Sequence, residues 1–498
     1  MELSKLLERE EYTTNHTLKG IEIKKLTANV NEITKNTLFV LVKGINFDTG
    51  KIIEYVLQKH PAALICDNDR KINAKIPVIF VENARKTLAI LCSKFNKIDY
   101  RKTRFVAVTG TNGKTTTATI LKSIFEKSGI KTGFIGTGKI AIGEKIINKK
   151  NYSMTTPDPE ILYPAIRKMQ DVGCGIIVME ISSHAIALEK IAPITFECGI
   201  FTNLSEEHMD FHKDMDDYYE TKLKLFRKCK VGIFNADDEY SARAMRECEN
   251  VCKTVSVGIL WNADAMARDV ILNGFDGSSY IYREHNLIFK TNLHLIGNYN
   301  LYNSLLATKC ALEMNIPPKV IRDAIDEIKN IDGRFEIIKD KVTVIIDYAH
   351  TEFACEKMLN TLNSFKKSEQ KVISVFGCGG NRDRSKRPKI AAIVEKYSDY
   401  AIVTTDNSRN EKEHDIIADI LEGFIDTKKR KVISSRERAI RYAIINSPDD
   451  SIIVIIGKGH ERYNITADGY HDFDERKIIS EALNTRNKRC NIQNENQA

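Results

Sequence analysis

The chain has 498 residues, and this length predicts about three domains. Hydrophobic residues make up 42% of the chain, which is enough for ordinary cores, and the net charge is +8. The N-terminal stretch MELSKLLEREEY lacks the apolar run of a signal peptide, and no apolar run approaches the roughly 20 residues that a membrane span needs. Basic and acidic residues are interspersed and the eleven cysteines are scattered. We therefore expect a cytoplasmic protein with reduced thiols, without a nucleic-acid groove and without a membrane partner.

Residues 1–101 carry the pattern of a small α/β unit. Apolar, β-branched runs at 37–42 and 62–66 predict two strands, and the segment 52–58 between them predicts a helix. The polar, basic stretch after Phe95 marks the end of this first domain.

The segment 105–125 places a glycine-rich turn between a strand and a helix. Phe105–Val108 predicts a buried strand, and two glycines and an asparagine end it before a helix that begins at Thr115. Main-chain N–H groups and the positive end of a helix make such a turn a phosphate cradle, in which Lys114 would reach the terminal phosphates. A hydroxyl of Thr115 or Thr116 would hold Mg²⁺. The alternative is an ordinary glycine turn, and the order Gly-Lys-Thr-Thr at a strand-to-helix junction argues against it.

Strands and helices alternate through the rest of the chain. The runs 175–181, 198–204 and 231–236 predict further strands of a mainly parallel α/β sheet. The pattern breaks near Gly333 and then resumes with four more predicted strands, at 342–349, 371–377, 400–405 and 451–457. We therefore predict a central ATP-binding domain over 102–332 and a third, Rossmann-like domain over 333–498.

Polar clusters follow two strands of the central segment. Glu180 comes at the end of one predicted strand, and the segment 203–210, which contains His208, follows the next. Because ligands of doubly wound sheets bind at the carboxyl ends of the strands, both clusters should face the phosphate turn. A carboxylate and a histidine beside phosphates suit a Mg²⁺ site that phosphate oxygens complete. A lone histidine is more often structural, but two polar clusters at one sheet edge favour a site.

These segments also resemble a known family. TGTNGKTT, MEISSHAIAL and FTNLSEEHMDFH are similar to motifs of the Mur ligases, which have three domains and form amide bonds with ATP. The resemblance implies that Thr115, Glu180 and His208 bind Mg²⁺, and that Lys114 belongs with them to the catalytic residues. YYETK resembles YEAAK, whose lysine is carbamylated in the family. This implies that Lys222 is catalytic and, as an anionic carbamate, is a further metal ligand.

The resemblance also assigns residues to ATP and to the other substrates. NADD at 235–238, GNYNLYN at 297–303, GRFE at 333–336 and DYAHT at 347–351 resemble segments on the ATP side. The implied ATP-binding residues are Gly110, Thr111, Asn112, Gly113, Lys114, Thr115, Thr116, Asn303, Arg334 and Asp347. The implied substrate-binding residues are Thr155, Thr156, Ser182, Lys190, Arg382, Asp406, Asn407, Arg409, Gly457 and Glu461. We expect His350 and Asp347 to position other groups rather than act as a general base.

The third domain resembles the branch of the family that extends UDP-N-acetylmuramoyl-L-alanyl-D-glutamate. GCGGNRDRSKRP, DNSRNE and GKGHE carry this likeness. Arg409 stands where that branch has an arginine for the distal carboxylate of meso-diaminopimelate, and a guanidinium pairs bidentately with a carboxylate. The resemblance implies that ATP phosphorylates the D-glutamyl carboxylate and that the amine of the diamino acid attacks the acyl phosphate. It also implies a monomer whose partners are these small molecules.

The first domain departs from the family pattern. Asn29–Asn31 and Asp48–Gly50 align with two segments that help to hold the UDP group in the family, and Val30 and Thr49 differ from the usual residues. Lys190 replaces an arginine, which keeps the charge but loses the planar fork. We therefore expect altered contacts at the UDP end.

Other interpretations stay open on the sequence alone. A divergent paralogue could use the same chemistry on another carboxylate, and folylpolyglutamate synthetase is a weaker variant of that idea. A non-catalytic ATP-binding protein is disfavoured by the intact Lys114, Glu180, His208 and Lys222. A nucleic-acid motor is disfavoured by the interspersed charge.

Overall fold

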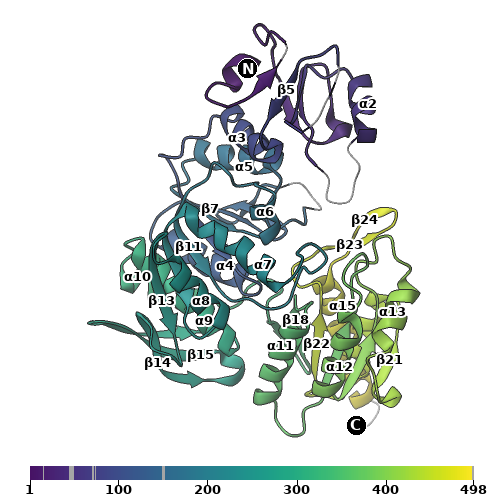
Figure 1. Ribbon diagram of the computed structural model, residues 1–498. Helices are drawn as coiled ribbons and strands as arrows, with labels where there is room; N and C mark the ends of the chain where they lie inside the picture. Colours follow the sequence, from purple (N-terminus) through teal and green to yellow (C-terminus); the bar gives the residue numbers. More distant parts are fainter. Residues whose placement is uncertain (15, 44–49, 70–71, 73, 149–151, 496–498) are drawn as a thin grey trace.

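A computed structural model describes residues 1–14, 16–43, 50–69, 72, 74–148 and 152–495. Its sheets fall into three groups along the chain, and each predicted domain segment contains one large sheet (Figure 1). In the described residues, no helix is long and apolar enough to cross a membrane. The ten cysteines from Cys66 to Cys378 are free thiols, as expected.

The first sheet has five strands in the order β1-β5-β4-β3-β2. Both expected strands and the expected helix are confirmed, as β3 (Thr37–Val40), β4 (Ala63–Asp67) and α2 (Gly50–Gln58). The remaining elements are α1 (Leu3–Leu6), β1 (Thr13–Thr14), β2 (Lys25–Thr27), β5 (Val78–Val81) and α3 (Ala84–Phe95). Helix α3 packs against α5 (Pro159–Asp171) of the central segment, so the first sheet is joined to the second through a helix pair (Figure 1).

The central sheet has eleven strands, and the strand before the phosphate turn lies in its middle. Strand β6 (Arg104–Thr109) pairs in parallel with β10 (Ile176–Glu180) on one side and β11 (Phe196–Phe201) on the other. Alternate residues of β6 enter different cores: Phe105 and Ala107 one, and Val106 and Val108 the other. This double burial explains the unbroken apolar run that the sequence shows.

Helices cover both faces of the central sheet. The core that contains Val106 also takes residues of α4 (Lys114–Lys127), α9 (Asn298–Glu313) and α10 (Pro318–Glu327). The opposite core takes residues of α5, α6 (Ser183–Ala187), α7 (Met215–Leu223) and α8 (Glu239–Cys248).

The expectation of a mainly parallel central sheet is confirmed, and antiparallel strands are added at both of its ends. The strands β7 (Thr132–Gly136), β12 (Cys229–Asn235), β13 (Lys253–Gly258) and the start of β14 (Ala265–Leu272) extend the parallel part. Antiparallel ladders add β8 (Lys139–Ile142) and β9 (Lys145–Ile146) at one end, and β15 (Ser278–Glu284) and β16 (Leu287–Leu293) at the other. The physical reason is the connection: two-residue turns link β8 to β9 and β15 to β16, and such turns join only antiparallel strands.

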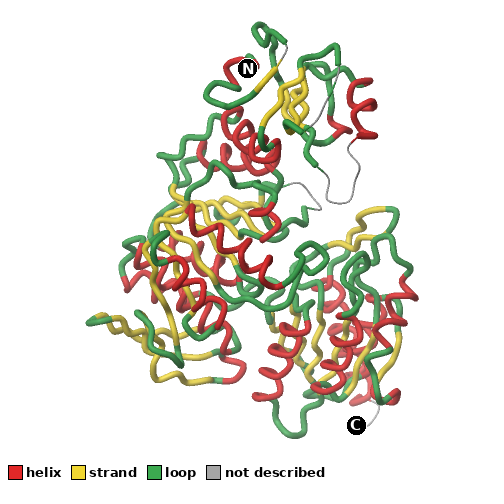
Figure 2. Tube along the Cα trace, in the orientation of Figure 1, coloured by secondary structure: helices red, strands yellow, loops and turns green. Residues whose placement is uncertain are grey.

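The third sheet has the order β17-β18-β22-β19-β20-β21, and its four expected strands are confirmed. They are β18 (Thr343–Asp347), β19 (Val372–Phe376), β20 (Tyr400–Val403) and β22 (Ile452–Ile456), all parallel; β21 (Arg430–Val432) is parallel and β17 (Glu336–Lys339) antiparallel. One core contains residues of α11 (Glu352–Phe365), α12 (Lys386–Tyr397) and α13 (Glu413–Leu421), and the other contains residues of α14 (Arg436–Asn446) and α15 (Glu475–Glu495). A hairpin, β23 (Tyr463–Thr466) and β24 (Gly469–Asp472), reaches toward the central segment (Figures 1 and 2).

Gly333 lies at the passage from the central segment to the third sheet. Its φ of +65° is in the left-handed region, and an added Cβ would lie 2.1 Å from the carbonyl carbon of Gly459. The main chain before β17 therefore packs directly on the loop after β22, and only glycine fits there.

We predict that Gly333→Ala lowers the melting temperature more than Gly129→Ala does. Both glycines have positive φ, but a Cβ on Gly129 would meet no atom within 4 Å. The two variants share the backbone strain, so their difference isolates the steric clash, worth about 1–3 kcal/mol. Equal melting temperatures in a thermal scan would contradict the close packing at Gly333.

Candidate active site

A cavity of about 600 Å³ lies between the central and third sheets. Residues from the phosphate turn, from Glu180 and from the segment 205–210 line one side of it. Residues that follow β18, β19, β20 and β22 line the other side. The carboxyl ends of parallel strands from two sheets thus face one space, which is the position expected for ligands of such sheets.

Two glycines shape the phosphate turn. Gly110 has a φ of +137°, and a Cβ there would lie 1.9 Å from the hydroxyl oxygen of Thr202. Gly113 precedes α4 with a φ of +85°, and its Cβ would lie 2.3 Å from Oδ1 of Asn303. Lys114 folds over this turn, and its Nζ donates to the carbonyl oxygens of Gly110, at 3.0 Å, and Thr111, at 2.7 Å. Burial lowers the pKa of Lys114, and the nearby Glu207 and Glu180 oppose that shift.

Glu180 is fully buried at the foot of this turn. Its carboxylate accepts hydrogen bonds from the hydroxyls of Thr115, at 2.9 Å, and Thr137, at 3.0 Å. Arg334, which comes from the other side of the cavity, donates to the same Thr115 hydroxyl at 3.1 Å and lies over the ring of Tyr348. A buried carboxylate with hydroxyl oxygens at a phosphate turn fits a hard cation such as Mg²⁺.

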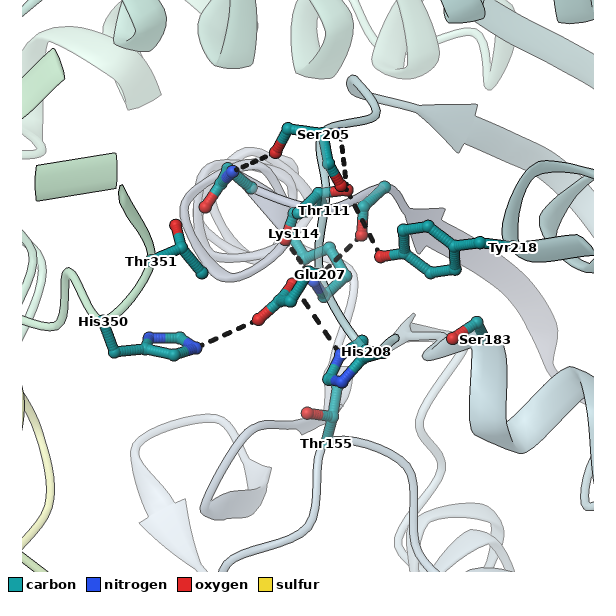
Figure 3. Close-up of polar contacts among 12 residues, drawn as sticks. Thr111, Lys114, Thr155, Ser183, Ser205, Glu207, His208, Tyr218, His350 and Thr351 are labelled. Atoms are coloured by element: carbon teal, nitrogen blue, oxygen red, sulfur yellow. Dashed lines mark hydrogen bonds and ion pairs between the residues drawn. The ribbon is translucent and has the colours of Figure 1, made fainter. Parts of the chain in front are cut away.

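Glu207 bridges the two sides of the cavity. One carboxylate oxygen lies 3.1 Å from Nε2 of His350, and the other lies 3.7 Å from Nε2 of His208 (Figure 3). Burial raises the pKa of Glu207, but the bond from His350 and the charges of His208 and Lys114 outweigh it, so the pKa is lowered well below its usual range. Glu207 therefore supplies a fixed negative charge between the phosphate turn and the third sheet.

Lys222 is 1% exposed on α7, beneath the phosphate turn. Its Nζ donates to the carbonyl oxygen of Gly110 at 3.1 Å and lies 4.5 Å from the ring centre of Tyr218. Burial lowers its pKa strongly, which favours the neutral amine. Within the described residues, no three His, Cys, Asp or Glu side chains gather as a metal centre, so Glu180 and His208 need further ligands from outside the protein or from a modified lysine.

The predicted residues of the third segment come together on the far wall of the cavity. Those that line it are Arg382, Asp406, Asn407, Arg409, Gly457 and Glu461. Arg409 has a φ of +53°, and its guanidinium donates to the carbonyl oxygen of Gly380 at 2.8 Å. Burial and the neighbouring Arg382 lower the pKa of Arg409, so two cationic side chains face the same region. A Cβ on Gly457 would lie 2.7 Å from the carboxylate of Asp406, which explains glycine there.

Other predicted residues are not among those that line the cavity, and their assigned roles stay predictions. Thr156 donates to the carbonyl oxygen of Glu180, Ser182 caps α6, and Lys190 pairs with Asp158 at 2.7 Å. Asn303 packs against Gly113, and the carboxylate of Asp347 accepts the main-chain N–H groups of Phe335 and Ala349. In contrast, Thr155 does line the cavity, as do Thr111, Asn112, Gly113, Lys114, Thr115, Thr116, Glu180, His208 and Arg334.

In the first sheet, Asn29 accepts a hydrogen bond from the N–H of Asn31 and starts a short 3₁₀ turn. Asp48 and Thr49 lie outside the described residues. Glu207 lies in the predicted polar segment 203–210, in which only His208 has an assigned role. Thr137 also lines the cavity and contacts Glu180, and nothing in the sequence around it marks it.

Family models match two long segments of the chain. The Mur ligase middle domain matches residues 108–311, and the Mur ligase glutamate ligase domain matches residues 333–459. The chain belongs to the Mur ligase family. As a Mur ligase it is an ATP-dependent, amide-bond-forming enzyme that uses Mg²⁺.

Curated relatives match this Mur ligase over nearly its whole length. A UDP-N-acetylmuramoyl-L-alanyl-D-glutamate–2,6-diaminopimelate ligase from Clostridioides difficile is 39% identical over 477 residues, covering 93% of this chain and 96% of the relative. A ligase of the same name from Aquifex aeolicus is 38% identical over 468 residues, covering 93% of this chain and 94% of the relative.

Solved structures share the fold. A structure titled as a UDP-N-acetylmuramoyl-L-alanyl-D-glutamate–2,6-diaminopimelate ligase superposes with a TM-score of 0.68 at 23% identity, covering 98% of this chain and 99% of that one. MurF ligase from Thermotoga maritima, solved with ADP, superposes with a TM-score of 0.61 at 16% identity, covering 95% and 99%. The three-domain Mur ligase fold is thereby confirmed.

We predict that Glu207→Gln lowers kcat of ATP-dependent ligation by about tenfold and raises the KM for ATP. The amide keeps the shape but removes the charge that Lys114 and His350 face, and charged hydrogen bonds contribute about 1.5–3 kcal/mol. Steady-state ADP release measures both constants. The control is Glu220→Gln on the exposed side of α7. Similar kinetics for the two variants would show that Glu207 has no special role.

Proposed function

We propose that this Mur ligase adds meso-diaminopimelate to the D-glutamyl carboxylate of UDP-N-acetylmuramoyl-L-alanyl-D-glutamate, a step of peptidoglycan precursor synthesis. The observation that supports it best is the cavity itself. The phosphate turn faces a wall that carries two arginines, Arg382 and Arg409, and a partly buried carboxylate, Glu461. These charges match a diamino acid, whose distal end carries one carboxylate and one ammonium. The names of the curated relatives agree with this substrate.

The residues on the ATP side suit transfer of a phosphoryl group to a carboxylate. Lys114 and Arg334 supply positive charge where the terminal phosphates would lie, and Thr115 links Arg334 to Glu180. Stabilising charge on the transferring group and holding the two oxygens in line are the main tasks in such a reaction. Mg²⁺, held by Thr115, Glu180 and His208, would neutralise further phosphate charge. The D-glutamyl carboxylate becomes an acyl phosphate, and attack by the amine releases inorganic phosphate.

The modified Lys222 belongs to the same proposal. Burial lowers the pKa of Lys222, which favours the neutral amine, and a neutral amine adds CO₂ with loss of one proton to give a carbamate. The product is an anion beside the phosphate turn, where a second carboxylate-like ligand would complete the donor set of Glu180 and His208. We also propose that the enzyme is a monomer, that it is cytoplasmic and that its contacts with the UDP group differ from those usual in the family.

We predict that Lys222→Ala is nearly inactive and regains part of its activity with a short carboxylic acid such as acetate. The added acid would occupy the space and carry the charge of the carbamate. Incubation with ¹³C-bicarbonate should give a carbamate carbon signal in the unmodified sequence that is lost in Lys222→Ala. Lys224→Ala, at an exposed position two residues on, is the control. Absence of the carbamate signal in active enzyme would overturn this role.

We predict that Arg409→Ala lowers kcat/KM for meso-diaminopimelate by about 10- to 100-fold and leaves the low value for L-lysine almost unchanged. Only meso-diaminopimelate has a second carboxylate to lose from Arg409, and hydrogen bonds between charged groups contribute about 1.5–3 kcal/mol. Ligation rates with each amino acid and the UDP-dipeptide decide this. Arg438→Ala, on the exposed side of α14, serves as the control. Equal kcat/KM values for the two amino acids in the unmodified enzyme would overturn the proposed substrate.

A further inference from the structure

A buried lysine lies behind the residues of the third segment that line the cavity. Lys458 lies between Gly457 and Gly459 in the loop after β22, and its side chain is 0% exposed. Its Nζ donates to Oδ1 of Asn407 at 2.9 Å and to the carbonyl oxygen of Tyr463 at 2.9 Å. The ammonium therefore joins three segments: the loop after β20, its own loop, and the start of the β23–β24 hairpin.

The hydrogen bonds around Asn407 fix the orientation of its amide. Oδ1 accepts from Nζ of Lys458 and also from the main-chain N–H of Ile465, at 2.9 Å. Two donors at one atom identify it as the oxygen, so the NH₂ group must point the other way. It donates to Oε2 of Glu461 at 2.8 Å. One oxygen of Glu461 is thus held in place, and the carboxylate lines the cavity.

Two carboxylates of the cavity wall lie close to this lysine. Nζ lies 3.6 Å from Asp406 and 3.9 Å from Glu461, and both carboxylates line the cavity. The other buried cation nearby, Arg436, lies 2.7 Å from Glu475 and 3.9 Å from Asp406. Burial and the charge of Asp406 raise the pKa of Glu461, whereas Lys458 and the amide of Asn407 lower it. Lys458 therefore helps to keep Glu461 ionised.

We propose that Lys458 is a positioning residue that holds Asn407 and Glu461 in the arrangement that receives the ammonium group of the amino-acid substrate. This inference rests on the proposed function. Lys458 itself does not line the cavity, so it acts through its neighbours. A purely structural role is the alternative, and a second buried lysine of this chain offers the matched comparison. Lys309 on α9 has a 5% exposed side chain and pairs with Glu284 and with Glu313 at 2.9 Å, outside the residues that line the cavity.

The test compares Lys458→Met with Lys309→Met in the full-length enzyme. Methionine keeps the side-chain length and removes the charge. For Lys458→Met we expect the KM for meso-diaminopimelate to rise by about tenfold or more, with the KM values for ATP and the UDP-dipeptide changed less than about twofold. Lys309→Met should lower the melting temperature and leave all three KM values within about twofold. If Lys458→Met behaves as Lys309→Met does, Lys458 is only structural and the inference is overturned.

The pH profile gives a second readout. Loss of the ammonium raises the pKa of Glu461, so the acidic limb of kcat/KM for the diamino acid should move to higher pH in Lys458→Met. The charged and titratable groups that act on Glu461 or respond to it are Asp406, Lys458, Arg409, Arg436, Tyr348, His350 and Tyr463. All of them except Lys458 remain in the variant. An unmoved acidic limb would contradict the inference.

The double variant Lys458→Met, Glu461→Gln keeps the test decisive if the single variant does not fold, because it removes the carboxylate left without its partner. We expect its KM for the diamino acid to equal that of Glu461→Gln alone, since Lys458 acts through Glu461. If the KM of the double variant were raised by the product of the two single fold-changes, the inference would be overturned.

A separate outcome concerns the proposed function. If the unmodified enzyme released no ADP in response to meso-diaminopimelate, the proposed function itself would fail, and so would the substrate named here.

Discussion

The hydrogen bond from Arg334 to Thr115 joins the two halves of the active site. Thr115 lies in the first turn of α4 and donates to the buried Glu180, so one hydroxyl connects a cation of the third segment with an anion at the end of β10. Glu207 and His350 make a second connection across the same cavity. Each link contains a charged group, and hydrogen bonds in which one partner is charged are stronger than those between neutral groups.

Charged side chains gather on both sides of the cavity, and each side offers them partners. On the ATP side, Lys114 and Lys222 donate hydrogen bonds to main-chain carbonyl oxygens of the phosphate turn, and burial lowers the pKa of both lysines. On the amino-acid side, Lys458 lies near the carboxylates of Asp406 and Glu461, and Arg382 and Arg409 line the same wall. The first region would pair with phosphate anions, and the second with an amino acid that carries both an ammonium and a carboxylate. The substrates of an amide-forming ligase would thus complete the charge balance of both regions.

Much of the fold follows from local patterns in the sequence. The central strands are predictable because burial on both faces requires unbroken apolar runs such as 105–108 and 452–456. The antiparallel ends of the central sheet could not be predicted in this way. Strands β15 and β16 mix buried and exposed positions, so they lack an unbroken apolar run, and the turn between them, at His285, lacks a glycine. The hairpin β23–β24 is missed for a similar reason: its second strand is largely exposed.

The candidate site is predictable where one motif carries the chemistry, as at Lys114, Glu180 and the loop that contains Arg409. Residues that act through distant partners escape such an analysis. Glu207 meets His350 across 143 positions and Lys458 meets Asn407 across 51, and neither partnership leaves a local pattern. Carboxylates and lysines in loops are usually solvated, so only the fold reveals which of them are buried and paired.

The central claim is that the two sides of this cavity carry out one reaction, in which a carboxylate is first phosphorylated and then attacked by an amine. The most direct test uses UDP-N-acetylmuramoyl-L-alanyl-D-glutamate labelled with ¹⁸O in its D-glutamyl carboxylate, together with ATP and meso-diaminopimelate. We expect one ¹⁸O atom to appear in each inorganic phosphate released, because the carboxylate oxygen that accepts the phosphoryl group leaves with it. Phosphate without ¹⁸O, released while the amide forms, would contradict the account.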